Sequence, residues 1–117
     1  MAVKNDIRDY HAATGCPLGR AKVLLSAMPP ELRERVLLAA RQKRDGKLLV
    51  DPIESDSTLA EKVHEAAQEA ERAADLRGCQ GRGRSHVVWA TQKNILADRH
   101  GIAWFSPKEM NPDVVFD

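Results

Sequence analysis

A segment rich in glycine and arginine has the clearest potential for chemistry in this sequence. It reads Gly-Cys-Gln-Gly-Arg-Gly-Arg-Ser over residues 78–85, immediately before a predicted helix. Three glycines free its backbone, so that amides at the helix start and the side chains of Arg82 and Arg84 can converge on one anion. The segment therefore predicts an anion-binding loop, and a flexible solvated linker is the alternative interpretation.

Two enzyme patterns come close to this segment but fail on context. The nucleotide-binding pattern G-x-x-x-x-G-K-S/T fits from Gly78 to Ser85, except that Arg84 stands where the lysine belongs. A cysteine-phosphatase loop would use Cys79 and Arg84, but four residues separate them where that loop has five. Both loops follow a buried strand of a sheet for which this chain is too short, so neither enzyme class is predicted.

The helix after the segment carries basic side chains along one face. His86, Lys93 and His100 recur every two turns, and only the methyl groups of Ala90 and Ala97 lie between them. Such a face can lie along a phosphate backbone. The lead hypothesis is contact with a polyanion, RNA or DNA, through Arg82, Arg84, His86, Lys93, Arg99 and His100.

An acidic helix supports a competing hypothesis. Glu61, Glu65 and Glu69 place like charges along one predicted helix, where they repel unless a basic element lies alongside. The basic residues can therefore serve this helix within the same chain. The alternative function is a protein-binding regulator or adaptor that uses the acidic helix or the C-terminal segment, including Trp104 and Phe105.

Cysteine and histidine residues raise the question of a metal site. Cys16, Cys79, His86 and His100 are suitable zinc ligands, but the sequence lacks the short paired spacings of zinc modules. We expect no metal or other cofactor, and we expect Cys16 to be a small buried apolar residue. No nucleophile, base and orienting acid stand at a recognisable spacing, so a binding protein is expected rather than an enzyme.

Helices are predicted to position all of these residues. Capping residues and glycine stops place them from about Asp6 to Ala13, from Pro17 to Met28, from Pro30 to Gly46, from Thr58 to about Arg77, from Ser85 to about His100, and in one last turn after Ser106. Ser85 is expected to cap its helix, and capping boxes are expected at Thr58 with Glu61 and at Ser106 with Glu109. A short extended piece is expected over residues 47–50.

Apolar spacing indicates which sides of these helices face inward. In the second helix the inward residues are expected to be Leu18, Ala21, Leu24, Leu25 and Met28. In the acidic helix a seam of small residues, Leu59, Val63, Ala66, Ala70 and Ala73, lets another helix approach closely. Core packing is the default expectation for both tryptophans, Trp89 and Trp104.

Length and composition place these helices in one domain, residues 1–117. Sixteen residues are alanine and only five are aromatic, a balance that favours closely packed helices over strands. We therefore expect an all-α protein, a compact bundle of about five short helices. It should begin with a helical hairpin and end in an apolar tail docked on the body.

The net charge of +1 conceals alternating blocks of charge. Residues 51–76 carry eight acids against two bases, whereas residues 1–47 and 77–108 are net basic. These blocks can neutralise one another within the fold or leave a basic face for a polyanion. No apolar run suits a membrane span or a signal peptide, so we expect a soluble cytoplasmic protein whose partner is nucleic acid or another protein, not a membrane.

Overall fold

The computed structural model describes residues 4–42 and 48–116. These residues form six α-helices and one 3-10 helix, and no strand occurs among them, so the all-α prediction is confirmed. The elements are α1 (Lys4–Thr14), α2 (Leu18–Ala27), α3 (Pro30–Gln42), η1 (Pro52–Ser55), α4 (Ala60–Leu76), α5 (Arg84–His100) and α6 (Pro107–Met110). None of the described helices is both long and apolar enough to cross a membrane.

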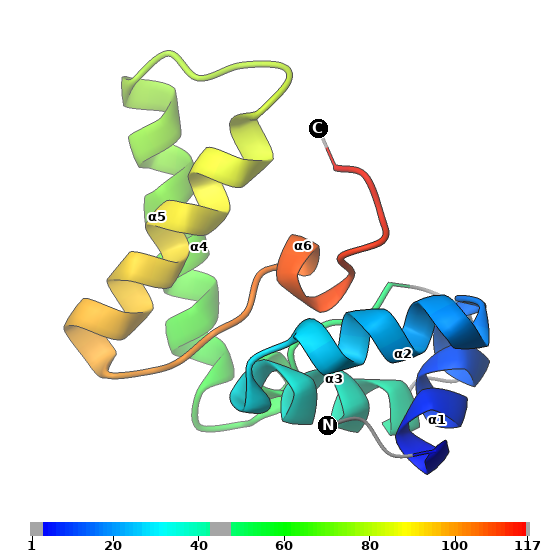
Figure 1. Ribbon diagram of the computed structural model, residues 1–117. Coiled ribbons are helices and arrows are strands. Elements are labelled where there is room, and N and C mark those ends of the chain that lie inside the picture. Colours follow the sequence, from blue (N-terminus) through cyan, green and yellow to red (C-terminus); the bar gives the residue numbers. More distant parts are fainter. Residues whose placement is uncertain (1–3, 43–47, 117) are drawn as a thin grey trace.

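Two helical units lie side by side and are bridged by the C-terminal part of the chain. Helices α1, α2 and α3 pack together in one unit, and α4 and α5 form an antiparallel pair in the other (Figure 1). Helix α6 lies between them (Figure 1). Its Met110 is buried in the core of α1–α3, whereas Trp104 is buried in the core of α4 and α5. The segment from 104 to 110 thus contributes to both cores.

A tight turn joins α1 to α2. Gly15 follows the end of α1 with φ of +75°, a conformation that glycine adopts without the steric cost of a Cβ. Pro17 stands directly before α2 as its N-cap. At the other end of α2, the half-buried side chain of Arg33 donates a hydrogen bond of 3.0 Å to the carbonyl of Met28. This bond satisfies a carbonyl oxygen at the end of the helix.

The capping box predicted at the start of the acidic helix is wrong. Helix α4 begins at Ala60, and no side chain caps it. Asp56 instead accepts hydrogen bonds from the backbone nitrogen and the hydroxyl of Thr58, at 2.8 and 2.6 Å. These bonds hold the pKa of the Asp56 carboxyl below its usual value. Thr58 therefore belongs to a local turn around an aspartate, which delays the helix.

Of the caps predicted for α5 and α6, the first is wrong and the second is confirmed. Gly83, rather than the predicted Ser85, is the N-cap of α5, and its φ of +84° requires a residue without a Cβ. Ser85 lies within the first turn of that helix. The predicted box of Ser106 and Glu109 is confirmed, since both of its reciprocal side-chain bonds are present at the start of α6.

The small-residue seam of α4 faces α5 with one change of position. Val63, Ala66, Ala70 and Ala74 are buried, whereas Ala73 is only half-buried. The last spacing along the seam, from Ala70 to Ala74, is four residues, whereas the prediction had three residues, from Ala70 to Ala73. The methyl groups allow α4 and α5 to pack closely along their length.

A side-chain amide holds the segment after α3. Of the extended piece expected over 47–50, Lys47 lies outside the described residues, as does the expected helix stop at Gly46, and Leu48 to Val50 form no regular element. The buried Asn111 accepts a bond of 2.8 Å from the Leu49 nitrogen and donates one of 2.8 Å to the Leu49 carbonyl. One side chain thus satisfies both backbone groups, as a neighbouring strand would.

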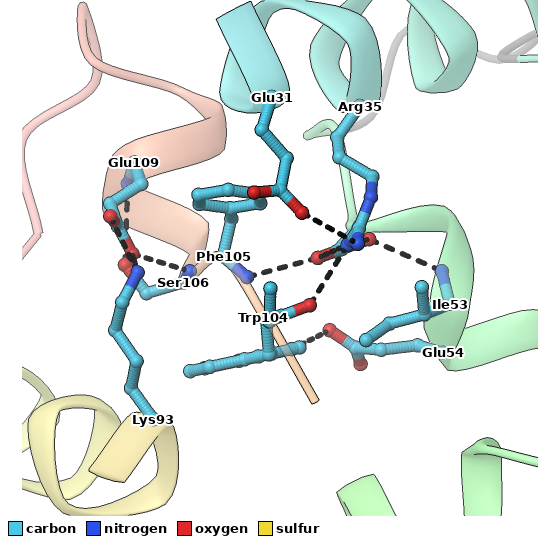
Figure 2. A network of polar contacts seen from close by, with 11 residues as sticks. Glu31, Arg35, Ile53, Glu54, Lys93, Trp104, Phe105, Ser106 and Glu109 are labelled. Atoms are coloured by element: carbon cyan, nitrogen blue, oxygen red, sulfur yellow. Dashed lines mark hydrogen bonds and ion pairs between the residues drawn. The ribbon is translucent and has the colours of Figure 1, made fainter. Parts of the chain in front are cut away.

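A buried carboxylate joins the two units. The side chain of Asp51 is 0% exposed and accepts bonds from Nη1 of Arg35 at 2.8 and 2.9 Å. It also accepts from the backbone nitrogens of Ile53, at 3.2 Å, and Phe105, at 2.9 Å. Figure 2 shows Arg35 of α3, Ile53 of η1 and Phe105 converging around this point. The network ties α3, η1 and the segment before α6 together.

Candidate functional site

The predicted anion-binding loop lies at the far end of the α4–α5 pair (Figure 1). Its glycines at 78, 81 and 83 all have positive φ, so the chain turns sharply here. Arg82 is exposed and has no ion pair with any described residue. Arg84, the other predicted ligand of the anion, is turned toward α4.

Arg84 is bound by the acidic helix. Its Nη2 lies 2.6 Å from a carboxylate oxygen of Glu71 and 2.9 Å from one of Asp75. Its Nη1 donates a bond of 2.7 Å to the carbonyl of Cys79. The hydrogen bond to Glu71, with support from Asp75, raises the pKa of Arg84 above its usual value. The guanidinium is therefore engaged within the chain rather than directed outward.

Two more of the predicted basic residues are also paired. Arg99 donates two parallel bonds of 3.1 Å to the carboxylate of Glu69, and this contact lowers the pKa of Glu69. Lys93 contacts both carboxylate oxygens of Glu109 at 2.9 Å, and its Nζ lies 4.7 Å from the centre of the Phe105 ring. Figure 2 shows this pair linking α5 to α6.

The predicted six residues do not form one free surface. Arg84 and Arg99 contact α4, whereas Lys93 contacts α6 and His86 lies 3.1 Å from the carbonyl oxygen of Phe116 through its Nε2. Only Arg82 and His100 have neither an ion pair nor a side-chain hydrogen bond with the described residues.

The residues proposed for protein binding divide into exposed and packed groups. Glu61 and Glu65 are exposed on α4. Trp104 is buried, and its Nε1 donates a bond of 2.9 Å to Glu54, whereas the half-buried Phe105 packs against the α1–α3 core. Burial raises the pKa of Glu54, although the bond from Trp104 partly opposes the shift. The two aromatic rings therefore stabilise the bridge between the units.

The two cysteines lie in different units and are free thiols. Cys16 is buried beside the α1–α2 turn, and Cys79 is half-buried at the far end of the α4–α5 pair. Burial, followed by the charge of Asp113, raises the pKa of the Cys16 thiol. Within the described part of the chain, no three His, Cys, Asp or Glu residues are arranged to hold a metal ion.

Helix α2 exposes apolar side chains that the sequence pattern did not reveal. The helix reads Leu-Gly-Arg-Ala-Lys-Val-Leu-Leu-Ser-Ala and contains no acid. Leu18, expected to face inward, is 51% exposed, and Val23 is 58% exposed, while Ala21 and Leu25 are fully buried. Leu18 and Val23 are five residues apart and so point to different sides of α2, and each exposes an apolar side chain that a further contact could cover.

The exposed Leu18 lies at a groove between α1 and α2. The groove has a volume of about 500 Å³ and is lined by Lys4, Ile7, Arg8, Leu18, Gly19 and Lys22. We call these residues the α1–α2 surface. Three of them are cations, and none of the three forms an ion pair with a described residue. By contrast, the nearby Arg41 is paired with Asp6 and Asp9.

The charged surfaces of the molecule differ in how much of their charge is free. Among the described residues, three of the six predicted anion ligands form ion pairs, whereas the α1–α2 surface combines the exposed Leu18 with three cations that form none. No protein-family model, no curated protein and no solved structure matches this chain. The α1–α2 surface is the strongest candidate for a functional site on its own chemistry.

Proposed function

We propose that this chain is a non-enzymatic binding protein whose partner is another protein, and that the partner docks on the α1–α2 surface. One observation supports this most strongly: the exposed Leu18 lines a groove with Lys4, Arg8 and Lys22, three cations that form no ion pair with a described residue. Apolar contact area favours a packed protein interface. The surrounding positive charge favours an acidic partner and disfavours a basic one.

The chemistry of the surface fits an amphipathic helix with acidic flanks. A groove between two helices accepts the apolar face of a third helix, whose anchoring side chains recur at helical spacing. Leucine-like side chains of the partner would cover Ile7 and Leu18. Its carboxylates would pair with the three cations that line the groove.

Contact with RNA or DNA, the lead hypothesis from the sequence, is the second candidate. The exposed arginines Arg77 and Arg82 at the glycine-rich loop favour it. However, Arg84, Lys93 and Arg99 would have to leave their carboxylate partners before they contact phosphate. Breaking those pairs offsets part of the electrostatic gain that drives nucleic-acid binding, so the internal ion pairs favour the protein partner.

A labelled model peptide tests the proposal. The probe is a fluorescent amphipathic helix of leucine and glutamate, compared with a version in which every glutamate is replaced by lysine. Fluorescence anisotropy should show binding of the acidic peptide alone. Leu18→Asp and Lys22→Glu should each weaken it by about tenfold or more, because each adds negative charge to the surface. An acid in the first turn of α2 is favourable, so Leu18→Asp should still fold.

Val115→Asp provides the matched control, since it makes the same change of charge at an apolar residue that is 88% exposed elsewhere. Its affinity for the peptide should equal that of the parent. Failure of the acidic peptide to bind, or an equal loss in the control, would contradict the proposal. A parent protein that instead binds a generic oligonucleotide, and loses this binding in Arg82→Ala, would favour the second candidate.

A further inference from the structure

The C-terminal segment crosses from one helical unit to the other. After α6 the chain continues from Asn111 to Phe116 without a helix and runs toward α5 (Figure 1). It contacts the α1–α2 turn through Asp113 and α5 through Phe116. The segment therefore covers surface on both units.

Asp113 makes the first contact. Its Oδ1 accepts a bond of 3.1 Å from Nε of Arg20, and its Oδ2 lies 3.9 Å from Sγ of Cys16. A cavity of about 260 Å³ lies between this part of the segment and the α1–α2 turn, with Tyr10 and Cys16 in its wall. Burial raises the pKa of Tyr10 to about 12, with smaller contributions from Cys16 and Asp113. The segment thus shields the thiol of Cys16 and the Tyr10 hydroxyl.

Phe116 makes the second contact. Its ring meets Trp89 edge to face, with ring centres 5.2 Å apart and planes at 86°. Trp89 makes a similar contact with His86, at 5.6 Å, and Nε2 of His86 lies 3.1 Å from the Phe116 carbonyl oxygen. A cavity of about 230 Å³ with His86, Trp89 and Lys108 in its wall remains open beside α5 and α6.

Backbone contacts hold the segment between these two points. Nζ of Lys108 donates bonds to the carbonyls of Pro112, at 3.0 Å, and Val114, at 2.7 Å. The side chain of Val115 points into solvent and is 88% exposed. Hydrogen bonds to the main chain, combined with contacts to individual side chains, are also what hold an extended peptide on a protein surface.

We propose that α5 and α6 form a peptide-binding site for an extended segment that carries an aromatic residue, and that the chain's own segment from Asn111 to Phe116 occupies this site. Few contacts hold the segment, and they lie near the surface, so it is released locally without unfolding of the helices. The site is separate from the α1–α2 surface, because Phe116 and Lys108 do not line that groove.

The reactivity of Cys16 reports release of the segment. In a Cys79→Ser background, Cys16 is the only thiol, and its rate of reaction with a disulfide reagent measures its exposure. Phe116→Ala removes the aromatic contact on α5 and should raise this rate by about fivefold or more, because the segment is released as a unit. Val115→Ala, the matched control, should react at the parent rate. Circular dichroism should show the same helix content in all variants.

A peptide added in trans provides the second measurement. The probe is a synthetic peptide with the sequence of residues 112–117, and in a Trp104→Phe background the fluorescence of Trp89 reports its binding. The parent segment competes at an effective concentration of the order of millimolar, so the peptide should bind the Phe116→Ala chain and not the parent. It should also slow the reaction of Cys16 in that variant. An unchanged Cys16 rate in Phe116→Ala, or no fluorescence response to the peptide, would overturn the proposal.

Discussion

Replacing Asp51 with alanine perturbs the point at which the two helical units are joined. The carboxylate is fully buried, whereas the side chain of Arg35 retains 21% of its exposure. Asp51 also accepts the backbone nitrogens of Ile53 and Phe105. The substitution therefore removes one ion pair and leaves two backbone amides without their acceptor.

The expected loss of unfolding free energy depends on how well water can solvate the groups that lose their partner. Removing one partner of a buried ion pair costs about 3–5 kcal/mol, and an unsatisfied buried amide costs about 1–3 kcal/mol. Because Arg35 is partly exposed, water can solvate its guanidinium after the substitution. We therefore expect a loss near the lower limit, about 3 kcal/mol. For a domain of this length, that loss lowers the Tm by about 12 °C.

Thermal and urea unfolding followed by circular dichroism measure the effect. Glu31→Ala is the matched control, because its carboxylate contacts the same Arg35 at 3.6 Å but is 61% exposed. It should change the free energy of unfolding by less than about 0.5 kcal/mol. If Asp51→Ala unfolds together with the parent and this control, the carboxylate does not hold the units together and the reasoning is refuted.

Three further predictions concern other contacts. Ala70→Leu should overpack the α4–α5 seam and lower stability by about 1–3 kcal/mol, whereas Ala73→Leu, at a half-buried position, should cost less; urea unfolding distinguishes them. Burial raises the pKa of Glu54, so its contribution to stability is full at acidic pH and falls as pH rises through the raised pKa. Glu54→Gln keeps an acceptor for Trp104 but has no carboxyl group to titrate. The Tm of this variant should therefore rise relative to that of the parent as the pH increases from acidic to neutral. Arg84→Ala should weaken the fold slightly in a melt without changing the affinity for the acidic peptide.

Helix ends were predictable from sequence where one residue determines them. Gly101 ends α5 in the left-handed conformation, and Ser106 with Glu109 begins α6, as their residue types indicate. The start of α4 was not predictable, because Asp56 and Thr58 both offer side-chain acceptors within the four residues before the helix. The aspartate forms the local turn, and no sequence spacing indicates which residue prevails.

The contacts that connect the two helical units were not predictable from sequence, because they join residues far apart in the chain. Asp51 lies 54 residues from Phe105, and Asn111 lies 62 residues from Leu49. Such side-chain bonds follow no periodicity, so only the three-dimensional structure reveals them. They depend on how α6 is placed between the units.

The candidate site was missed for a different reason. Helix α2 has apolar residues both on its buried side, at Ala21 and Leu25, and on an exposed side, at Val23, so its spacing does not distinguish the inward side from the outward side. Leu18 was assigned inward on that basis, although it is exposed. For the charged residues, alternating blocks predicted either internal pairing or a free basic face, and sequence does not decide between them. Arg84 and Arg99 form internal pairs.

The most direct test of the proposed function is to map where the acidic peptide contacts the protein. Two-dimensional ¹H–¹⁵N NMR spectra of the labelled protein, recorded during titration with the peptide, report each backbone amide separately. Docking in the groove predicts chemical-shift changes concentrated in α1 and α2, at the amides of Ile7, Arg8, Leu18, Gly19 and Lys22. Changes concentrated in the glycine-rich loop at 78–85 or on α5, with α1 and α2 unaffected, would contradict it.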